Sequence, residues 1–245
     1  MNLFFEVFSE MDRLAPGSEA STVKALQSVR EILEPMDIFE IGCGSGAQTM
    51  VLAQNTRASI TALDNHAPYL RTLEARAMAS GFGGRIQTVE GSMFEPSCSL
   101  DPYDVIWAEG CLYIMGFEKG LLQWRDLLRD GGVIAFSEAS WLIDSPSAEP
   151  VAFWRQAYPE MSGIEENCRK AENLGYRVHD HFVLPSFDWE DEYYSQLKER
   201  IKIMRPRFVR NRKANQFFSG LEAEMKLYQR YGCEYGYVFY ILQKA

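Results

Sequence analysis

Histidine and cysteine are scarce in this chain, with three and five of its 245 residues. The cysteines are widely separated, form no C-x-x-C pair and do not cluster with histidine. Because zinc sites and disulfide frameworks need such clusters, we expect no metal site. An odd number of separated cysteines is typical of reduced thiols, and we expect a cytoplasmic location.

Positive charge is also in short supply. The formal net charge is −9, which argues against general nucleic-acid binding because that function needs a basic surface. No apolar run approaches the ~18 residues of a membrane span. The first twelve residues are apolar but carry acids and no basic region, so we do not expect a signal peptide.

One segment departs from this charge balance. Residues 198–213 contain eight Lys or Arg and one Glu. The simplest interpretation is a solvated helix face with compensating acids nearby. The alternative is an attraction for an anionic substrate or partner.

A glycine-rich turn follows the first strongly apolar run. Residues 40–46 read Glu-Ile-Gly-Cys-Gly-Ser-Gly, the pattern E-x-G-x-G-x-G. The dinucleotide fingerprint G-x-G-x-x-G places its third glycine one position later, and a P-loop needs G-x-x-x-x-G-K-[ST], so neither pattern matches. Glu40 would repel a pyrophosphate but would attract an ammonium group. S-adenosylmethionine carries an ammonium group and a sulfonium cation, and it has no phosphate.

With these features the chain resembles the class I S-adenosylmethionine-dependent methyltransferases. A second strand-like run ends in Asp64, 22 residues after Gly42, where the family binds both ribose hydroxyls. A third run ends in Gly-Ser-Met at residues 91–93, where the family usually has an acid facing the adenine amino group. The resemblance covers residues 20–142. Segments 153–160 and 235–241 resemble a type 11-like, small-molecule branch of the family.

The resemblance implies a cofactor site at the glycine turn and at the ends of the next three strands. The glycines let the backbone approach the ligand, Glu40 accepts from the methionine ammonium, and Asp64 offers two oxygens to two hydroxyls. Asp64 can also cap the helix that begins near Pro68. Ser92 and Met93 replace the usual acid, with a weaker acceptor and a side chain that packs on the adenine ring. The predicted cofactor-binding residues are Glu40, Gly42, Cys43, Gly44, Gly46, Asp64, Asn65, Ser92, Met93 and Glu109.

The fourth run ends in Ala-Glu-Gly-Cys-Leu-Tyr, a position that lies beside the transferable methyl group in this family. Nucleobase amino-methyltransferases carry an N-P-P-Y-like motif there, so we reject that activity. Glu109 and Tyr113 are the candidate catalytic residues. Glu109 binds the acceptor, acts as a base or only supports the cofactor, and Tyr113 shapes the pocket. A base is required only if the acceptor must lose a proton early.

Apolar runs that alternate with helical patterns predict an α/β fold. The resemblance implies a doubly wound, Rossmann-like methyltransferase sheet of seven strands in the order 3-2-1-4-5-7-6, with the last strand antiparallel. We expect a single domain over residues 1–245. Residues 1–19 are predicted to form a helical lid, and residues 188–231 a helical insert between the sixth strand (177–184) and the seventh (235–242).

Aromatic residues are frequent after the fifth run. They can surround a small apolar acceptor, cage a sulfonium or an amine through cation–π attraction, or simply pack in a core. His179 and His181 alternate on the predicted sixth strand, so we expect both on one side of the sheet and interpret them as structural. The aromatic residues concerned are Trp141, Trp154, Tyr158, Trp189, Tyr193 and Tyr194.

The predicted function is transfer of a methyl group from S-adenosylmethionine to a small-molecule acceptor, which leaves S-adenosylhomocysteine. Two alternatives stay open. One is a regulatory protein that binds S-adenosylmethionine without catalysis. The other is a methyltransferase with a macromolecular acceptor.

Overall fold

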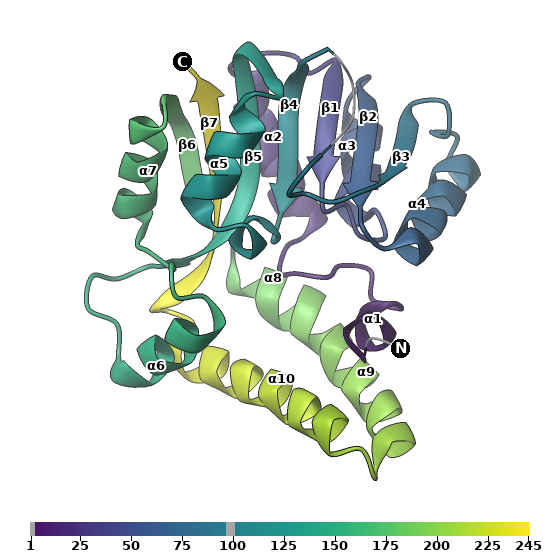
Figure 1. The fold of residues 1–245 in the computed structure, drawn as a ribbon, viewed down its shortest axis with the longest axis vertical. Coiled ribbons are helices and arrows are strands. Elements are labelled where there is room, and N and C mark those ends of the chain that lie inside the picture. The colour runs from purple at the N-terminus through teal and green to yellow at the C-terminus, as the bar shows by residue number, and fades with distance from the viewer. Residues whose placement is uncertain (1–2, 97–100) are drawn as a thin grey trace.

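The computed structural model describes residues 3–96 and 101–245. Its sheet contains β1 (Asp37–Ile41), β2 (Ser59–Asp64), β3 (Ile86–Glu90), β4 (Tyr103–Glu109), β5 (Leu128–Trp141), β6 (Tyr176–Val183) and β7 (Tyr235–Lys244). The strand order is β3-β2-β1-β4-β5-β7-β6 (Figure 1), so the predicted order is confirmed. β7 is antiparallel to both β5 and β6, and the pairs among the first five strands are parallel.

Helices cover both faces of this sheet. One face packs against α2 (Glu19–Arg30), α3 (Ala47–Asn55) and α4 (Ala67–Ala79), and the other against α5 (Phe117–Arg125) and α7 (Ile164–Asn173). Figure 1 shows α5 and α7 in front of the sheet and α2 and α3 behind it. Every residue of β4 is buried, as expected for a parallel strand covered on both faces. None of the helices in the described residues is long and apolar enough to cross a membrane.

A set of helices lies beyond the carboxyl ends of the parallel strands (Figure 1). Between β6 and β7 the chain forms α8 (Ser186–Trp189), a π-helical turn (Glu190–Tyr194), α9 (Ser195–Met204), a 3-10 turn (Arg205–Phe208) and α10 (Arg212–Tyr231). α6 (Ala148–Ala157) lies beside α10. The rings of Trp189 and Tyr228 stack with their centroids 4.4 Å apart, which joins α8 to α10.

The first helix, α1 (Leu3–Phe8), packs against α9. Arg200 of α9 is buried and donates to the backbone oxygens of Val7 and Glu6 at 2.9 and 3.0 Å. The same guanidinium pairs with Glu10. A helix of six residues is too short to be stable alone, so these contacts to α9 hold α1 in place.

The two histidines of β6 lie on different sides, contrary to the expectation from simple alternation. The register of β6 against β7 shifts between Val178 and Asp180, and this bulge places an extra residue in the strand. His179 Nε2 lies 3.2 Å from the Glu31 carboxylate, just after α2. His181 lies against the ring of Tyr240, in the cluster on the α5 and α7 face. A bulge of one residue reverses the alternation beyond it.

The glycine turn joins β1 to α3 through backbone that other residues rarely adopt. Gly42, Gly44 and Gly46 have φ values of +72°, +54° and +87°. At Gly46 an added Cβ would also lie 2.3 Å from Leu73 Cδ1 of α4. At Gly81, where φ is +78°, an added Cβ would meet nothing within 4 Å. An alanine at either position would carry the same left-handed backbone strain. Only at position 46 would its side chain also collide with a neighbour.

Gly46→Ala should destabilise the protein more than Gly81→Ala. A left-handed alanine costs about 1–2 kcal/mol, and overpacking against Leu73 adds about 1–3 kcal/mol. Urea unfolding of both variants and of the wild type measures the difference. Equal losses of unfolding free energy would show that the close approach of α4 to the turn is unimportant for stability.

Candidate functional site

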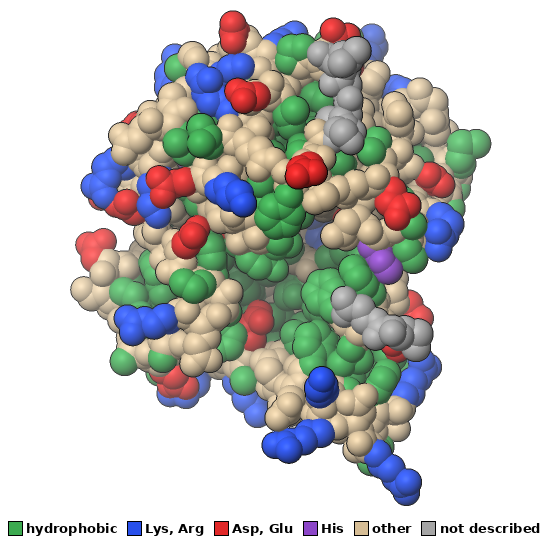
Figure 2. Space-filling view, viewed as in Figure 1, with side chains coloured by type: hydrophobic (Ala, Val, Ile, Leu, Met, Phe, Trp, Pro, Cys, Tyr) green, Lys and Arg blue, Asp and Glu red, His purple; other side chains and the backbone are tan. Residues whose placement is uncertain are grey.

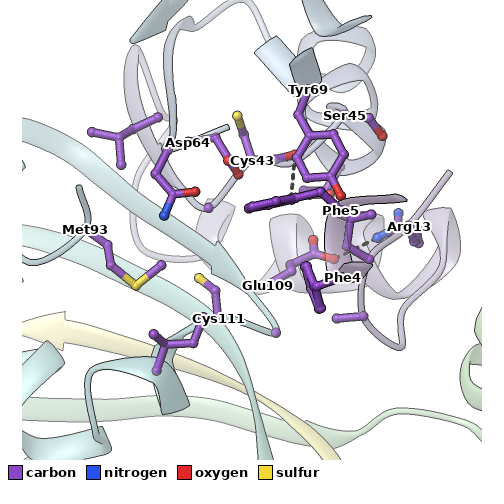
Figure 3. A pocket seen from close by; sticks show the side chains of 18 of the residues that line it. Phe4, Phe5, Arg13, Cys43, Ser45, Asp64, Tyr69, Met93, Glu109 and Cys111 are labelled. Carbon is purple, nitrogen blue, oxygen red and sulfur yellow. Dashed lines mark hydrogen bonds and ion pairs between the residues drawn. The ribbon is translucent and has the colours of Figure 1, made fainter. Parts of the chain in front are cut away.

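The carboxyl ends of β1, β2 and β4 meet beneath the N-terminal segment and enclose a cavity of about 220 Å³ (Figure 3). Its walls come from the glycine turn, from the residues that follow β2, β3 and β4, and from residues 4, 5 and 12–16. The strand order reverses between β1 and β4. Ligands of open α/β sheets bind at such a reversal point.

The glycine turn is held against the end of β2 by its own backbone. The N–H groups of Gly42 and Cys43 both donate to the Leu63 carbonyl, at 2.8 and 3.0 Å. The Gly44 N–H donates to the Asp64 carboxylate at 2.9 Å. Gly42 and Cys43 line the cavity. Burial raises the pKa of the Cys43 thiol, which agrees with its interpretation as a small packing residue.

Asp64 organises two turns at once. One of its oxygens accepts from Gly44 N and the other accepts from the backbone N–H of His66 at 2.9 Å. His66 is the N-cap residue of α4, and no side chain caps this helix. Asp64 therefore holds the turn that precedes α4 and does not cap the helix itself. The side chain also lines the cavity, and partial burial raises its pKa. Each carboxylate oxygen can accept a further hydrogen bond, which leaves capacity for a ligand hydroxyl.

Glu109 is engaged by three side chains of the protein. Its Oε2 pairs with Arg13 Nη1 at 2.8 Å, and its Oε1 accepts from Thr22 Oγ1 at 2.8 Å and from Trp107 Nε1 at 2.9 Å. Arg13 and Glu109 are both buried, and Figure 3 shows their side chains pointing toward one another. Since both oxygens already have donors, this arrangement favours a supporting role for Glu109 over that of a base.

Glu40 is the opposite case. It has no exposed surface, and neither of its carboxylate oxygens has a hydrogen-bond partner among the described residues. Burial raises its pKa to about 8, and the nearby Thr49 and Gln48 side chains oppose this only in part. Gln48 itself lines the cavity. A buried carboxyl group without a donor is costly, and a cationic ligand in the cavity would relieve that cost.

α1 supplies apolar side chains to the cavity. Phe4 and Phe5 line it, and the ring of Phe5 stacks on His66 with centroids 3.7 Å apart. Tyr69 meets both rings edge-on, at 5.9 Å from Phe5 and 4.5 Å from His66. Burial lowers the pKa of His66. Aromatic groups therefore form one wall of the cavity, beside Asp64 (Figure 3).

Only some of the residues predicted to face an adenine line the cavity. Asn65 and Met93 line the cavity. Ser92 does not: it is exposed, and its hydroxyl accepts from the Phe94 backbone at 3.2 Å. The lining also lacks Glu40, Gly44 and Gly46. Glu40 is a buried carboxyl group behind the lining, and the two glycines shape the turn.

The residues after β4 form the opposite wall. Tyr113 lines the cavity and is partly exposed. Cys111 donates to the Ile41 carbonyl at 3.2 Å, and a Cβ added at Gly42 would lie 2.9 Å from its sulfur. Gly42 therefore lets the first strand and the segment after β4 approach closely.

Sequence reasoning missed several lining residues. Arg13 gave no signal because it is a single charge in a segment without periodicity. Cys111, Gln48 and Tyr69 resembled ordinary buried residues of a loop and two helices. Phe5, in contrast, lies in the predicted N-terminal lid, although its apolar helical pattern was also compatible with an ordinary docking face.

The donors and acceptors of the cavity fit S-adenosylmethionine better than a nucleotide phosphate. Arg13 is the single Lys or Arg of the described lining, and it is already paired. Asp64 and the nearby Glu40 favour hydroxyl and ammonium groups. Among the described residues, no group of His, Cys, Asp and Glu could hold a metal ion.

Removing Arg13 should destabilise the protein strongly, because it leaves Glu109 buried without its cation. Arg13→Met is expected to cost about 3–5 kcal/mol of unfolding free energy. The double variant Arg13→Met/Glu109→Gln removes the unpaired charge and should lose less than Arg13→Met alone. Urea unfolding of the two single variants and the double variant measures the coupling. Additive losses would contradict a direct pair.

The central part of the chain matches the sequence model of a known family. Residues 38–132 match the methyltransferase domain. Over 158 residues the chain is 29% identical to protein arginine N-methyltransferase 1 of Dictyostelium discoideum, covering 60% of this chain and 46% of that protein. Over 172 residues it is 22% identical to sterol 24-C-methyltransferase of Yarrowia lipolytica, covering 66% and 45%. The chain thus spans less than half the length of these relatives.

Solved structures share the fold over the whole chain. A S-adenosylmethionine-dependent methyltransferase from Thiobacillus denitrificans, in complex with S-adenosylhomocysteine, superposes with a TM-score of 0.85 and 20% identity, covering 100% of this chain and 99% of that one. A counterpart from Geobacter sulfurreducens, also in complex with S-adenosylhomocysteine, gives 0.83 and 20%, covering 99% and 98%. At this identity the likeness concerns the fold. Over residues 38–132 and in its fold, the chain is therefore similar to the class I S-adenosylmethionine-dependent methyltransferases.

Proposed function

We propose that this protein transfers a methyl group from S-adenosylmethionine to a small-molecule acceptor and leaves S-adenosylhomocysteine. The observation that carries the proposal is the set of acids around the glycine turn. Among the described residues, Glu40 lies buried without a hydrogen-bond partner, and Asp64 follows the next strand and lines the cavity. This set suits a ligand with an ammonium group and vicinal hydroxyls, and it does not suit a phosphate.

S-adenosylmethionine supplies a methyl group that is already activated by its sulfonium. The protein has to position the donor and the acceptor and to exclude water, and orientation can contribute ~7–11 kcal/mol to lowering a barrier. In the proposed site, Glu40 and Gln48 hold the ammonium group and Asp64 holds the ribose hydroxyls. Met93 and the aromatic rings beside Phe5 pack on the adenine.

The covered position of the cavity supports a small acceptor. Residues 4–5 and 12–16 line it from above, so an extended chain would have to displace α1 or this segment. The curated relatives named above act on protein arginine and on sterol, respectively, and therefore do not decide between acceptor classes. The basic segment gives limited support to a macromolecular acceptor, because Arg200, Lys202 and Arg205 pair with glutamates.

Binding of S-adenosylmethionine and S-adenosylhomocysteine is the first test. Calorimetric titration of the wild type should give micromolar affinity for both ligands. Asp64→Ala should weaken binding at least tenfold, about 1.4 kcal/mol, because it removes the acceptor for the hydroxyls and also the anchor of Gly44. Asp64→Asn keeps one acceptor oxygen and should fall between the two.

Absence of binding to folded wild-type protein would overturn the proposal. Binding without turnover across a broad screen of small-molecule acceptors would favour the regulatory alternative. Methylation of a protein substrate, with no reaction of any small molecule, would favour the macromolecular one.

Binding should also release a proton near neutral pH. With a pKa of about 8, Glu40 is mostly protonated at pH 7 in the free protein, and an ammonium group beside it favours the ionised form. Calorimetry in two buffers with different ionisation enthalpies should therefore show release of up to about one proton at pH 7.

Two controls check this assignment. At pH 9 Glu40 is already ionised, so the release should disappear. Glu40→Gln should bind more weakly and lose most of the release at pH 7. An unchanged proton count in Glu40→Gln would place the ammonium group elsewhere.

A further inference from the structure

A second buried carboxyl group lies beyond the cofactor cavity. Glu138, near the carboxyl end of β5, has 0% exposed surface. Neither of its oxygens has a hydrogen-bond partner of normal geometry among the described residues. Burial raises its pKa to about 8, and the nearby Tyr158 hydroxyl and Tyr113 backbone amide oppose this only in part. Nothing in the cofactor site uses this group.

Tyrosine rings surround this position. Tyr113 and Tyr158 meet edge-on with centroids 5.9 Å apart. Tyr237 is buried beside Gly110, where an added Cβ would lie 3.7 Å from its ring. Burial raises the pKa of Tyr113 to about 12, and Glu138 adds to that rise. Glu138 likewise raises the pKa of Tyr237, after burial and Tyr113.

A third acid approaches the same rings from the helical insert. Glu224 of α10 is partly buried and accepts from the Tyr194 hydroxyl at 2.9 Å. Its charge raises the pKa values of Tyr113, Tyr193 and Tyr237, in each case after burial. The ring of Tyr194 lies 5.7 Å from that of Trp189, which in turn lies 5.3 Å from Tyr237. These ring contacts join Glu224, on a distant helix, to the tyrosines near Glu138.

This group adjoins the cofactor cavity on the side of the acceptor. Tyr113 belongs to both, because it also lines the cavity. Figure 2 shows a cleft in this part of the molecule, between the sheet and the helices beyond its carboxyl edge, and hydrophobic side chains line most of it. A small molecule in the cleft would therefore be close to both the tyrosines and the cavity.

Neither acid is neutralised by a direct ion pair among the described residues. The oxygens of Glu138 have no hydrogen-bond partner of normal geometry, and the partner of Glu224 is the Tyr194 hydroxyl. An anionic acceptor would meet repulsion here. A cation is attracted both by carboxylates and by the faces of aromatic rings.

We propose that the methyl acceptor is an amine, bound as its ammonium ion between Glu138 and Glu224 against Tyr113, Tyr193 and Tyr237. This inference rests on the proposed function and adds the substrate class. The unpartnered Glu138 oxygens supply acceptors for the N–H groups, and the rings enclose the carbon groups on nitrogen.

The same arrangement provides a path for the proton. Glu138 takes one proton from the ammonium ion, which leaves a lone pair on nitrogen. That lone pair forms a bond to the methyl carbon of the sulfonium donor, and the carbon–sulfur bond breaks with its electron pair remaining on sulfur. The product is a methylated ammonium ion and a neutral thioether, and the total charge is unchanged. A base whose pKa is raised toward that of an ammonium ion is better suited to this transfer.

The test compares three molecules that share a tert-butyl group and differ in charge: tert-butylamine, which is an ammonium ion at pH 7, tert-butanol and pivalate. Each is titrated into protein saturated with S-adenosylhomocysteine and followed by saturation-transfer NMR. The amine should bind at least tenfold more tightly than the alcohol or the acid. Glu138→Gln should weaken amine binding about tenfold, and Glu224→Gln should weaken it severalfold.

Glu160→Gln is the matched control. Glu160 is an exposed acid whose charge also reaches Glu138, so its removal should change amine affinity by less than twofold. The affinity for S-adenosylhomocysteine should be the same in all three variants. Should Glu138→Gln fail to fold, Glu224→Gln tests the site from a different element.

The outcomes separate the two proposals. If the wild type does not bind S-adenosylhomocysteine, the proposed function fails. If it does, but amine and alcohol bind alike or Glu138→Gln and Glu224→Gln leave amine affinity unchanged, the amine acceptor is overturned and the cofactor site stands. Preference for the amine that depends on Glu138 and Glu224 but not on Glu160 supports the proposal.

Discussion

The buried pair of Arg13 and Glu109 is the interaction on which the site depends. It joins the N-terminal segment to the end of β4, across residues that are 96 positions apart in the chain. Thr22 and Trp107 satisfy the remaining acceptor of the carboxylate. Because an unpaired charge in this position would be costly, the segment that covers the cavity, the start of α2 and the central strand are held in one arrangement. Arg200 holds α1 in a similar way.

Two other buried acids, Glu40 and Glu138, have no such cationic partner among the described residues. Glu40 lies behind the glycine turn and Glu138 lies among tyrosines, and burial raises the pKa of each to about 8. Burial without a donor opposes folding, so these groups are better explained by ligands than by stability. Glu40 on β1 and Glu138 on β5 lie on the two sides of β4. These positions agree with the proposal that Glu40 binds the ammonium group of the cofactor and Glu138 binds a cationic acceptor.

The part of the cavity around the glycine turn could be predicted because its signals are local. Three glycines in a seven-residue turn require left-handed backbone, and an acid at the end of the next strand must lie beside them, since parallel strands end at the same edge. Asn65 and Met93 follow from the same rule. The position of Glu224 could not, because it depends on how the insert between β6 and β7 folds back over the sheet.

The sequence by itself therefore determined the fold class, the strand order through its resemblance, and the place of the glycine turn. Backbone requirements and apolar periodicity depend on residues that are neighbours in the sequence, so they can be recognised without knowing any long-range contact. Only the tertiary structure decided that Glu109 pairs with Arg13 and that a bulge separates His179 from His181. It also decided that Glu40 and Glu138 have no hydrogen-bond donor of normal geometry among the described residues. These outcomes depend on packing between segments that are far apart in the sequence, and no pattern within either segment predicts that packing.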